Sequence, residues 1–197
     1  MKEIYRLSPS SIFEVANEEV FLEREDDAHK DYINCRDHYE LFYAISKYYN
    51  PDSILEIGTR YGYSLYSLIL GSSVLNKVVG YDINEEYVKV TDENLSTNTV
   101  SRVNLKLEVA DTQKIDELDD KYRLIHIDGD KSFAGTYHDL KLTRGKARVV
   151  LVSDFYSERT VRDATQRFVY DNKEKIKKTH VIESLRGLYI IEYRGWK

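Results

Sequence analysis

Short apolar runs alternate with longer amphipathic stretches along this chain of 197 residues. The short runs predict strands near 53–57, 77–82, 103–109, 122–128, 147–153, 178–184 and 187–193. The amphipathic stretches predict helices near 10–22, 27–49, 62–71, 84–97, 134–143 and 158–171. This alternation indicates an α/β fold, in which right-handed crossovers place helices on both faces of a parallel sheet.

The last two predicted strands break the alternation. Only Arg186 and Gly187 lie between the run at 179–185 and the run at 188–193. A connection this short permits an antiparallel hairpin and no parallel pairing. We therefore expect an α/β sheet of seven strands that ends in an antiparallel hairpin.

The segment 53–64 reads as a strand, a glycine turn and the start of a helix. Its spacing is Glu56-x-Gly58-x-x-x-Gly62. The fingerprint of dinucleotide binders has a glycine where Arg60 stands, and a side chain there would crowd a pyrophosphate. Glycines permit positive φ, and amides at the start of a helix can bind a carboxylate. The turn therefore favours a smaller ligand over a nicotinamide dinucleotide.

Acidic residues follow the ends of the other predicted strands. Asp82 lies 24 residues after Gly58, a separation that suits an acceptor for a ribose diol. Asp82 can also cap the next helix together with Asn84. Asp128 and Asp154 end two later strands, and two such carboxylates can converge on a divalent cation.

Two of these segments resemble a known family. The segment 53–64 resembles the first motif of class I S-adenosylmethionine (SAM)-dependent methyltransferases, with the L-E-x-G-x-x-x-G-Y-S loop of small O-methyltransferases related to catechol and caffeoyl-CoA O-methyltransferases. The segment 122–133 resembles the I-D-G-D-H-S-Y motif of a subfamily that includes bacterial macrolide and cephalosporin O-methyltransferases. Here Lys131 replaces histidine and Phe133 replaces tyrosine. The resemblance implies a Rossmann-like seven-stranded methyltransferase sheet.

The resemblance also implies a set of site residues. SAM would bind over Glu56, Gly58, Thr59, Arg60, Tyr61, Gly62 and Ser64, with Asp82 and Ile83 at the ribose, Asp111 and Thr112 at the adenine, and Asp128 nearby. Lys131, three residues after Asp128, has the offset of the general base in catechol-type enzymes. The alternative for Lys131 is an exposed ion pair with Asp128 or Asp130. Asp128 and Asp154 are the candidate Mg²⁺ ligands, but Phe155 replaces a further ligand found in metal-dependent relatives, so the metal stays open.

The implied function is O-methylation of a small hydroxylated metabolite. The alternatives are a non-catalytic SAM-binding scaffold and a nicotinamide-dependent oxidoreductase. We expect residues 50–197 to form the SAM-binding domain and residues 1–49 a helical cap, which in relatives covers the site or builds a homodimer contact. His29, Tyr32 and His38 of this cap either face a substrate or lie on a helix surface.

Composition excludes several other classes of partner. The net charge of −5 argues against nucleic acid, because a phosphate backbone attracts basic surfaces. No run approaches the roughly 18 apolar residues of a membrane span. The single cysteine, Cys35, excludes an intrachain disulfide and fits a reducing cytoplasm.

Overall fold

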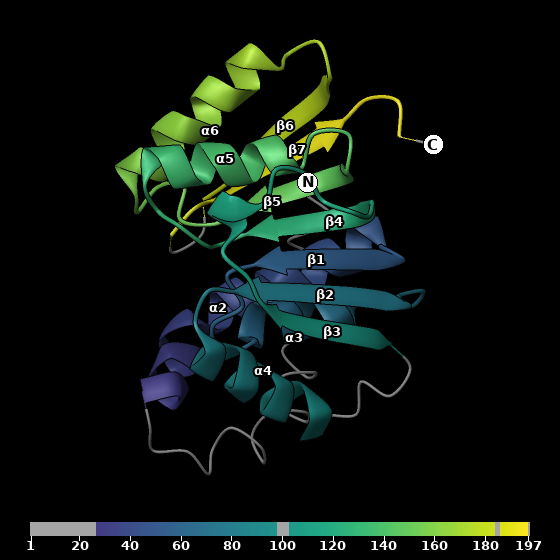
Figure 1. The fold of residues 1–197 in the computed structure, drawn as a ribbon, viewed down its shortest axis with the longest axis vertical. Coiled ribbons are helices and arrows are strands. Elements are labelled where there is room, and N and C mark those ends of the chain that lie inside the picture. Colours follow the sequence, from purple (N-terminus) through teal and green to yellow (C-terminus); the bar gives the residue numbers. More distant parts are fainter. Residues whose placement is uncertain (1–26, 98–102, 184–185, 197) are drawn as a thin grey trace.

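The structure is a computed structural model that describes residues 27–97, 103–183 and 186–196 (Figure 1). The helix predicted near 10–22 lies outside these residues. The strands are β1 (Ser53–Ile57), β2 (Lys77–Asp82), β3 (Asn104–Val109), β4 (Tyr122–Ile127), β5 (Ala147–Val152), β6 (Ile176–Ile182) and β7 (Leu188–Tyr193). The helices are α2 (Asp27–Tyr49), α3 (Tyr63–Gly71), α4 (Glu85–Thr97), α5 (Phe133–Leu142) and α6 (Arg159–Asp171), with a short 3₁₀ helix η2 (Thr112–Lys114).

The described strands form one sheet in the order β3-β2-β1-β4-β5-β7-β6. The pairs among β1 to β5 are parallel, whereas β7 runs antiparallel to both β5 and β6. The predicted α/β sheet of seven strands with its antiparallel hairpin is therefore confirmed. The strand β6 begins two residues earlier than predicted, and its pairing with β7 shifts in register between Ile176 and Lys178.

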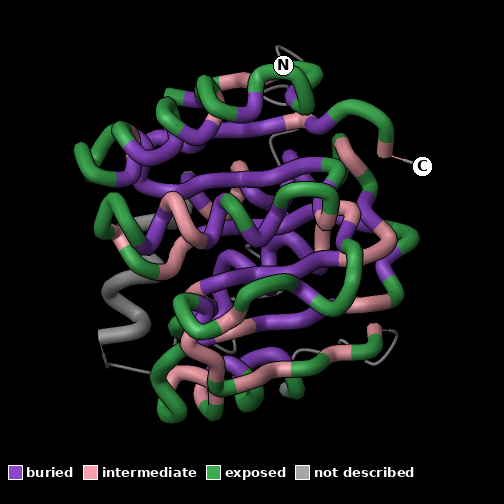
Figure 2. The backbone as a smooth tube through the Cα atoms, turned by 45° about the horizontal axis from the view of Figure 1, so that its top comes forward, coloured by how far each residue is buried: buried purple, intermediate pink, exposed green. Residues whose placement is uncertain are grey.

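Helices cover both faces of this sheet, as Figure 2 shows by the buried strands between partly exposed helices. One apolar cluster joins α5 and α6 to one face, with Leu140 and Phe168 fully buried. The other cluster joins α2, α3 and the end of α4 to the opposite face. Phe42 and Ile45 of α2 lie in this second cluster together with Ile54 of β1, so α2 packs on the sheet itself.

Because β1, β2, β4 and β5 run in the same direction, their carboxyl ends lie along one edge of the sheet. Ligands of open α/β sheets bind outside this edge. None of the helices in the described ranges has the length and apolar character that a membrane crossing requires.

Candidate functional site

The turn between β1 and α3 holds three residues in the left-handed region. Gly58, Arg60 and Gly62 have φ values of 87°, 46° and 81°. A Cβ built on Gly58 would lie 2.6 Å from the carbonyl oxygen of Asp128, so glycine is required for the close approach of this turn to the end of β4. Arg60 occupies the position where a dinucleotide binder has glycine, and it keeps a glycine-like backbone while adding a side chain.

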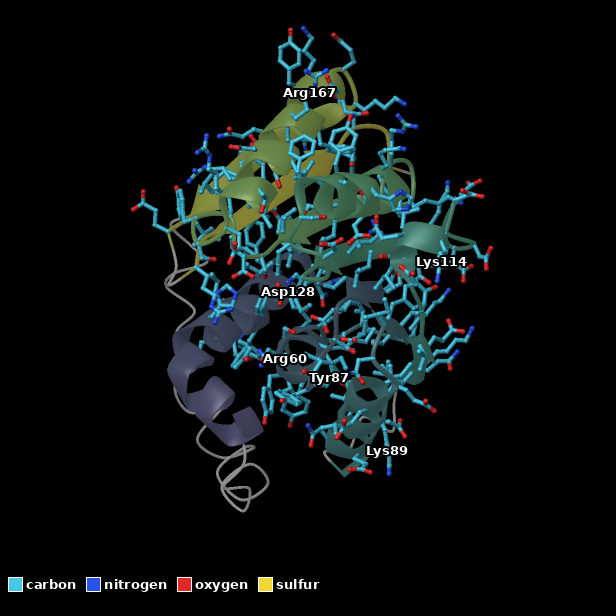
Figure 3. All side chains as sticks on the ribbon, turned by 60° about the vertical axis from the view of Figure 1, so that its left-hand side comes forward. Arg60, Tyr87, Lys89, Lys114, Asp128 and Arg167 are labelled. Atoms are coloured by element: carbon cyan, nitrogen blue, oxygen red, sulfur yellow. The ribbon has the colours of Figure 1, made fainter. Side chains whose placement is uncertain are left out.

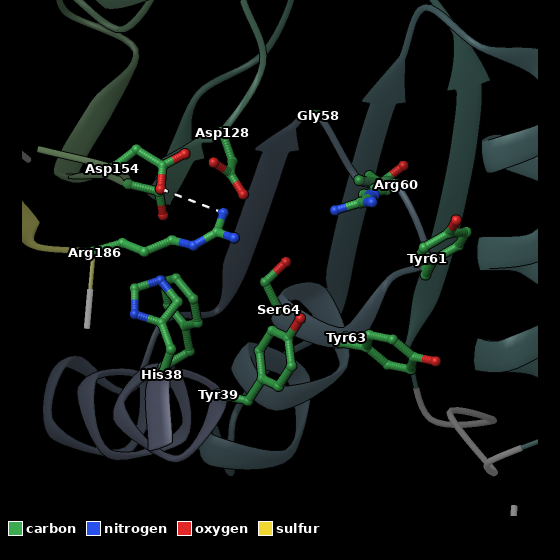
Figure 4. A pocket seen from close by; sticks show the side chains of 13 residues that line it. His38, Tyr39, Gly58, Arg60, Tyr61, Tyr63, Ser64, Asp128, Asp154 and Arg186 are labelled. Atoms are coloured by element: carbon green, nitrogen blue, oxygen red, sulfur yellow. Dashed lines mark ion pairs between the residues drawn. The ribbon is translucent and has the colours of Figure 1, made fainter. Parts of the chain in front are cut away.

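Two adjoining hollows open above this turn, with volumes of about 490 Å³ and about 70 Å³. The predicted site residues that line the larger hollow are Gly58, Arg60, Asp82, Ile83, Asp111, Thr112, Asp128, Lys131 and Asp154. Those that line the smaller hollow are Gly58, Thr59, Arg60, Tyr61, Ser64, Asp128 and Asp154 (Figure 4). Glu56 and Gly62 are not among the lining residues of either hollow.

Asp82 lies in the wall of the larger hollow and already accepts two backbone hydrogen bonds. Its carboxylate accepts from the amide of Arg60 at 2.8 Å and from the amide of Asn84 at 2.9 Å. Asn84 in turn accepts from the amide of Glu86 in the first turn of α4. Each carboxylate oxygen has two lone pairs, so a ribose could still donate to Asp82. Ile83 beside it is 70% exposed, which leaves an apolar surface open within the hollow.

The far end of the larger hollow is built around Asp111 and Thr112. Asp111 accepts from the amide of Gln113 and pairs with Lys114 at 3.1 Å. The hydroxyl of Thr112 donates to Asp139 of α5 at 2.7 Å. Asp139 is fully buried, and this burial raises the pKa of its carboxyl to about 6. Its Oδ2 has no hydrogen-bond partner among the described residues.

Lys131 joins two strand-end carboxylates at the other end of the hollow. Its ammonium hydrogen bonds to Asp128 and lies 2.9 Å from Asp154. Burial lowers the pKa of Lys131, but the two carboxylates outweigh it and hold the pKa above its ordinary value. Asp154 also accepts from Ser157 at 3.1 Å and lies 3.6 Å from the guanidinium of Arg186.

This cluster fits a divalent cation poorly. The Lys131 ammonium already bridges the two carboxylates predicted as ligands. Phe155, which follows Asp154, is buried and packs against Tyr189 with ring centroids 4.6 Å apart, so it offers no oxygen. Within the described part of the chain, no three His, Cys, Asp or Glu side chains are grouped as a metal site would need.

Comparison with known families decides the family of this chain. The model of a family described as O-methyltransferase matches residues 31–163, which is more than half of the chain. The chain belongs to the O-methyltransferase family. The resemblance read from segments 53–64 and 122–133 is thereby confirmed. A comparison with curated proteins finds no match.

Solved structures share the fold of this O-methyltransferase. TomG from Streptomyces achromogenes, an O-methyltransferase involved in tomaymycin synthesis and solved with SAM, is 15% identical with a TM-score of 0.70, over 99% of this chain and 100% of TomG. PaMTH1 from Podospora anserina, a methyltransferase bound to S-adenosylhomocysteine (SAH), is 18% identical with a TM-score of 0.70, over 98% of this chain and 92% of PaMTH1. Identities this low show the fold alone.

A buried polar chain runs beneath the site of this O-methyltransferase. Glu56 Oε1 lies 2.5 Å from His126 Nδ1, and His126 Nε2 lies 2.8 Å from the hydroxyl of Ser153. Burial raises the pKa of Glu56, although its bond to His126 opposes the shift. The contact of Glu56 with a cofactor ammonium stays a prediction. Glu56 is fully buried, its Oε1 is bound to His126, and its Oε2 has no hydrogen-bond partner among the described residues.

His38 and Arg186 both line the smaller hollow. His38 of α2 lines the hollow, and burial lowers the pKa of its imidazole to about 4, so it is neutral at pH 7. The side chains of His29 and Tyr32 lie outside the described part. Arg186 lines both hollows, which its place in a hairpin turn gave no reason to expect. The hairpin folds over the site because the Arg186 carbonyl accepts from the amides of Tyr156 and Ser157.

Proposed function

We propose that this O-methyltransferase transfers a methyl group from SAM to a hydroxyl group of a small molecule. One observation carries the proposal: a single hollow connects acids suited to a nucleoside, Asp82 and Asp111, with the Asp128–Lys131–Asp154 cluster. The binding groove and the polar groups that could act on an acceptor therefore face the same space.

The residues of the larger hollow fit the nucleoside part of SAM. Asp82 keeps lone pairs for ribose hydroxyls, and the exposed Ile83 offers an apolar surface to an adenine ring. Asp111 and Thr112 stand where the adenine edge would lie. Two of the neighbours described above were solved with SAM or SAH, which supports the same cofactor here.

SAM supplies a methyl group on a positively charged sulfonium. Attack on that carbon requires alignment of the acceptor hydroxyl and removal of its proton. We assign proton removal to the neutral amine of Lys131, which forms once the ammonium has lost its own proton to solvent, and orientation of the hydroxyl to Asp128 and Asp154. A positive charge beside Lys131 lowers its pKa, which opposes the effect of the two carboxylates. Because the cluster fits Mg²⁺ poorly, no step is assigned to a metal.

We also propose that the enzyme is cytoplasmic and acts on a free metabolite. The net charge of −5 disfavours a nucleic-acid acceptor. The homodimer predicted from the resemblance belongs to the same proposal and is tested by light scattering.

Calorimetry with SAH and with NAD tests cofactor choice. We expect SAH to bind and NAD not to bind. Asp82→Asn should weaken SAH binding about 10- to 100-fold, because a neutral amide accepts more weakly than a carboxylate. Asp92→Asn, an exposed change on α4, is the matched control and should bind like wild type. Tight NAD binding without SAH binding would contradict the proposal.

Labelled SAM then tests the reaction, with phenols, sugars and polyketide-like alcohols as acceptors. We expect turnover on at least one of these classes. Confirmed SAH binding with turnover on none would favour the non-catalytic scaffold over the enzyme.

A further inference from the structure

A further hollow lies at the edge of the sheet opposite to the site described above. Figure 3 shows the carboxyl edge, with Arg60 and Asp128 of the larger hollow. Lys121 precedes β4, Ala147 begins β5 and Tyr193 ends the antiparallel β7, so these three residues share the amino edge. They line a hollow of about 300 Å³ together with Gly145, Glu174, Lys175, Arg194, Gly195 and Trp196.

The size and the aromatic part of this hollow fit a small molecule. Ligand pockets in proteins have volumes of roughly 300–1,000 Å³, so this hollow has the size of a small one. A Cβ built on Gly145 or Gly195 would meet no atom within 4 Å, so the space above both residues is open. The half-buried ring of Trp196 offers a surface on which a planar ring can stack.

The cations of this wall lack partners within the protein. Lys121, Lys175 and Arg194 are exposed, and none of them forms an ion pair with another described residue. The neighbouring Lys146, by contrast, pairs with Glu117 at 2.7 Å. Positive charge that no carboxylate neutralises remains available to an anionic ligand.

The balance of charge indicates which anion fits. Among the described lining residues, Glu174 is the one carboxylate beside the three cations. A phosphate monoester, with a charge of about −1.5 to −2 at pH 7, matches the remaining positive charge. Arg194 is also held in place, because its Nε donates to the carbonyl of Ile176 at 3.0 Å. The other N–H donors of its planar fork can meet phosphate oxygens.

The positive charge and the aromatic ring adjoin each other. Lys121 Nζ lies 5.8 Å from the centroid of the Trp196 ring, which is a cation–π contact. A ligand that joins an anion to a planar ring would therefore meet both features of the wall.

We propose that this hollow binds a phosphate monoester that carries a planar ring. The ring could be a nucleobase or a phenyl group, because the same wall chemistry recognises both. The inference goes beyond methyl transfer, since no residue of this wall lines the two hollows at the carboxyl edge.

The fluorescence of Trp196 tests the proposal, because Trp196 is the only tryptophan of the chain. Phenyl phosphate and uridine 5′-monophosphate are the probes. We expect a saturable change with at least one of them, and the tighter probe identifies the kind of ring. Phenol, uridine and inorganic phosphate should each bind at least about 10-fold more weakly, because each lacks the charge or the ring.

Variants of the wall test where the probes bind. By calorimetry, Arg194→Gln and Lys175→Gln should each weaken the binding of the tighter probe about 10-fold, because each removes a charge-assisted hydrogen bond. Lys173→Gln is the matched control and should bind like wild type. Lys173 lies on the same connection but contacts the ring of Tyr170 at 5.7 Å and does not line the hollow.

The outcomes separate this site from the proposed function. The site is overturned if neither phosphate ester gives a saturable response. Equal affinity for inorganic phosphate, or equal losses in Lys173→Gln and Arg194→Gln, would also overturn it, because a basic surface would then attract any anion. Saturating SAH should leave the probes bound, and displacement by SAH would place them at the carboxyl edge instead. Failure of wild type to bind SAH would count against the cofactor assignment alone.

Discussion

Lys131 lies between Asp128 and Asp154, the two carboxylates that the sequence offered as candidate Mg²⁺ ligands. If Lys131 is the general base, Lys131→Ala should reduce methyl transfer by about 100- to 10,000-fold. A chelator should change the wild-type rate little, because the lysine ammonium already neutralises the carboxylates. Initial rates for wild type, Lys131→Ala and Asp154→Ala, each with and without chelator, measure both effects.

Lys89→Ala is the control for this experiment, since Lys89 is exposed on α4 and meets Glu93 only at 4.0 Å. It should leave the rate unchanged. Near-wild-type turnover by Lys131→Ala would show that Lys131 is not the base. Its role would then be the exposed ion pair that the sequence also allowed. Loss of wild-type activity with chelator, restored by Mg²⁺, would show that a cation displaces Lys131.

Asp139 gives the protein a pH-dependent stability. Burial raises its pKa to about 6 from the ordinary 3.8, so between these pH values the folded state binds more protons than the unfolded state. The unfolding free energy contributed by Asp139 is therefore highest below pH 4 and falls as the pH rises through 6. Relative to wild type, Asp139→Asn should gain roughly 2–3 kcal/mol between pH 4 and pH 7.

Urea unfolding at a series of pH values measures this gain. The difference between variant and wild type is the quantity to compare, because His38 titrates in an overlapping range. Thr112→Val removes a hydrogen bond that favours the charged carboxylate, so it should move the titration to higher pH. A difference that does not vary with pH would contradict the buried, protonated Asp139.

At the residue scale, the sequence identified the strand-end acids because each ends an apolar run. It did not identify Asp139, His126 or Arg186 as parts of the site. Asp139 lies within a helix pattern, and His126 lies within a strand pattern, where a polar residue carries no signal of its partner. Their roles come from contacts across 26 to 70 residues of sequence, which only the fold brings together.

Among the structural elements, the β1–α3 turn depends on Gly58. Gly58→Ala combines an unfavourable positive φ with a Cβ 2.6 Å from backbone atoms at the end of β4. Gly145 has a similar φ of 79°, and its Cβ would meet no atom within 4 Å. Gly145→Ala therefore measures the cost of the backbone conformation alone, about 1 kcal/mol.

We expect Gly58→Ala to cost about 2–4 kcal/mol of unfolding free energy, since backbone atoms cannot shift as a flexible side chain can. It should also weaken SAH binding, because the turn borders both hollows. Urea unfolding and calorimetry of the two variants measure these effects. Equal costs for Gly58→Ala and Gly145→Ala would mean that the close approach to Asp128 is not a constraint.

The boundaries of an element were predictable where turn-forming residues such as proline, aspartate and glycine flank it. The strand β1 is bounded by Pro51 and Asp52 before it and by Gly58 after it, and its predicted bounds match the structure. The start of β6 was placed two residues late, because Lys177 and Lys178 interrupt the apolar pattern where the register shifts. The 3₁₀ turn η2 was not predicted, since it depends on the Asp111 cap and carries no apolar period.

For the whole molecule, the order of strands and helices was enough to predict the fold class. The alternation of strands and helices predicted the parallel sheet. The two-residue link between the last strands predicted the antiparallel hairpin. The relation of α2 to this sheet was not predictable, because the helix precedes every strand and its pattern does not say which face it covers. In the structure it lies on α3 and on the face that carries His126, whose ring centroid is 4.6 Å from that of Phe42.

This packing predicts that α2 and the sheet unfold together. Phe42 is 1% exposed, and Phe42→Ala should lower the unfolding free energy by about 3–5 kcal/mol. Tyr48→Ala is the matched control on the same helix, because Tyr48 is 48% exposed and should cost far less. Urea unfolding followed by both circular dichroism and tyrosine fluorescence should give one coincident transition for each protein. Two separated transitions, or an unchanged midpoint for Phe42→Ala, would instead show that α2 forms an independent cap over residues 50–197.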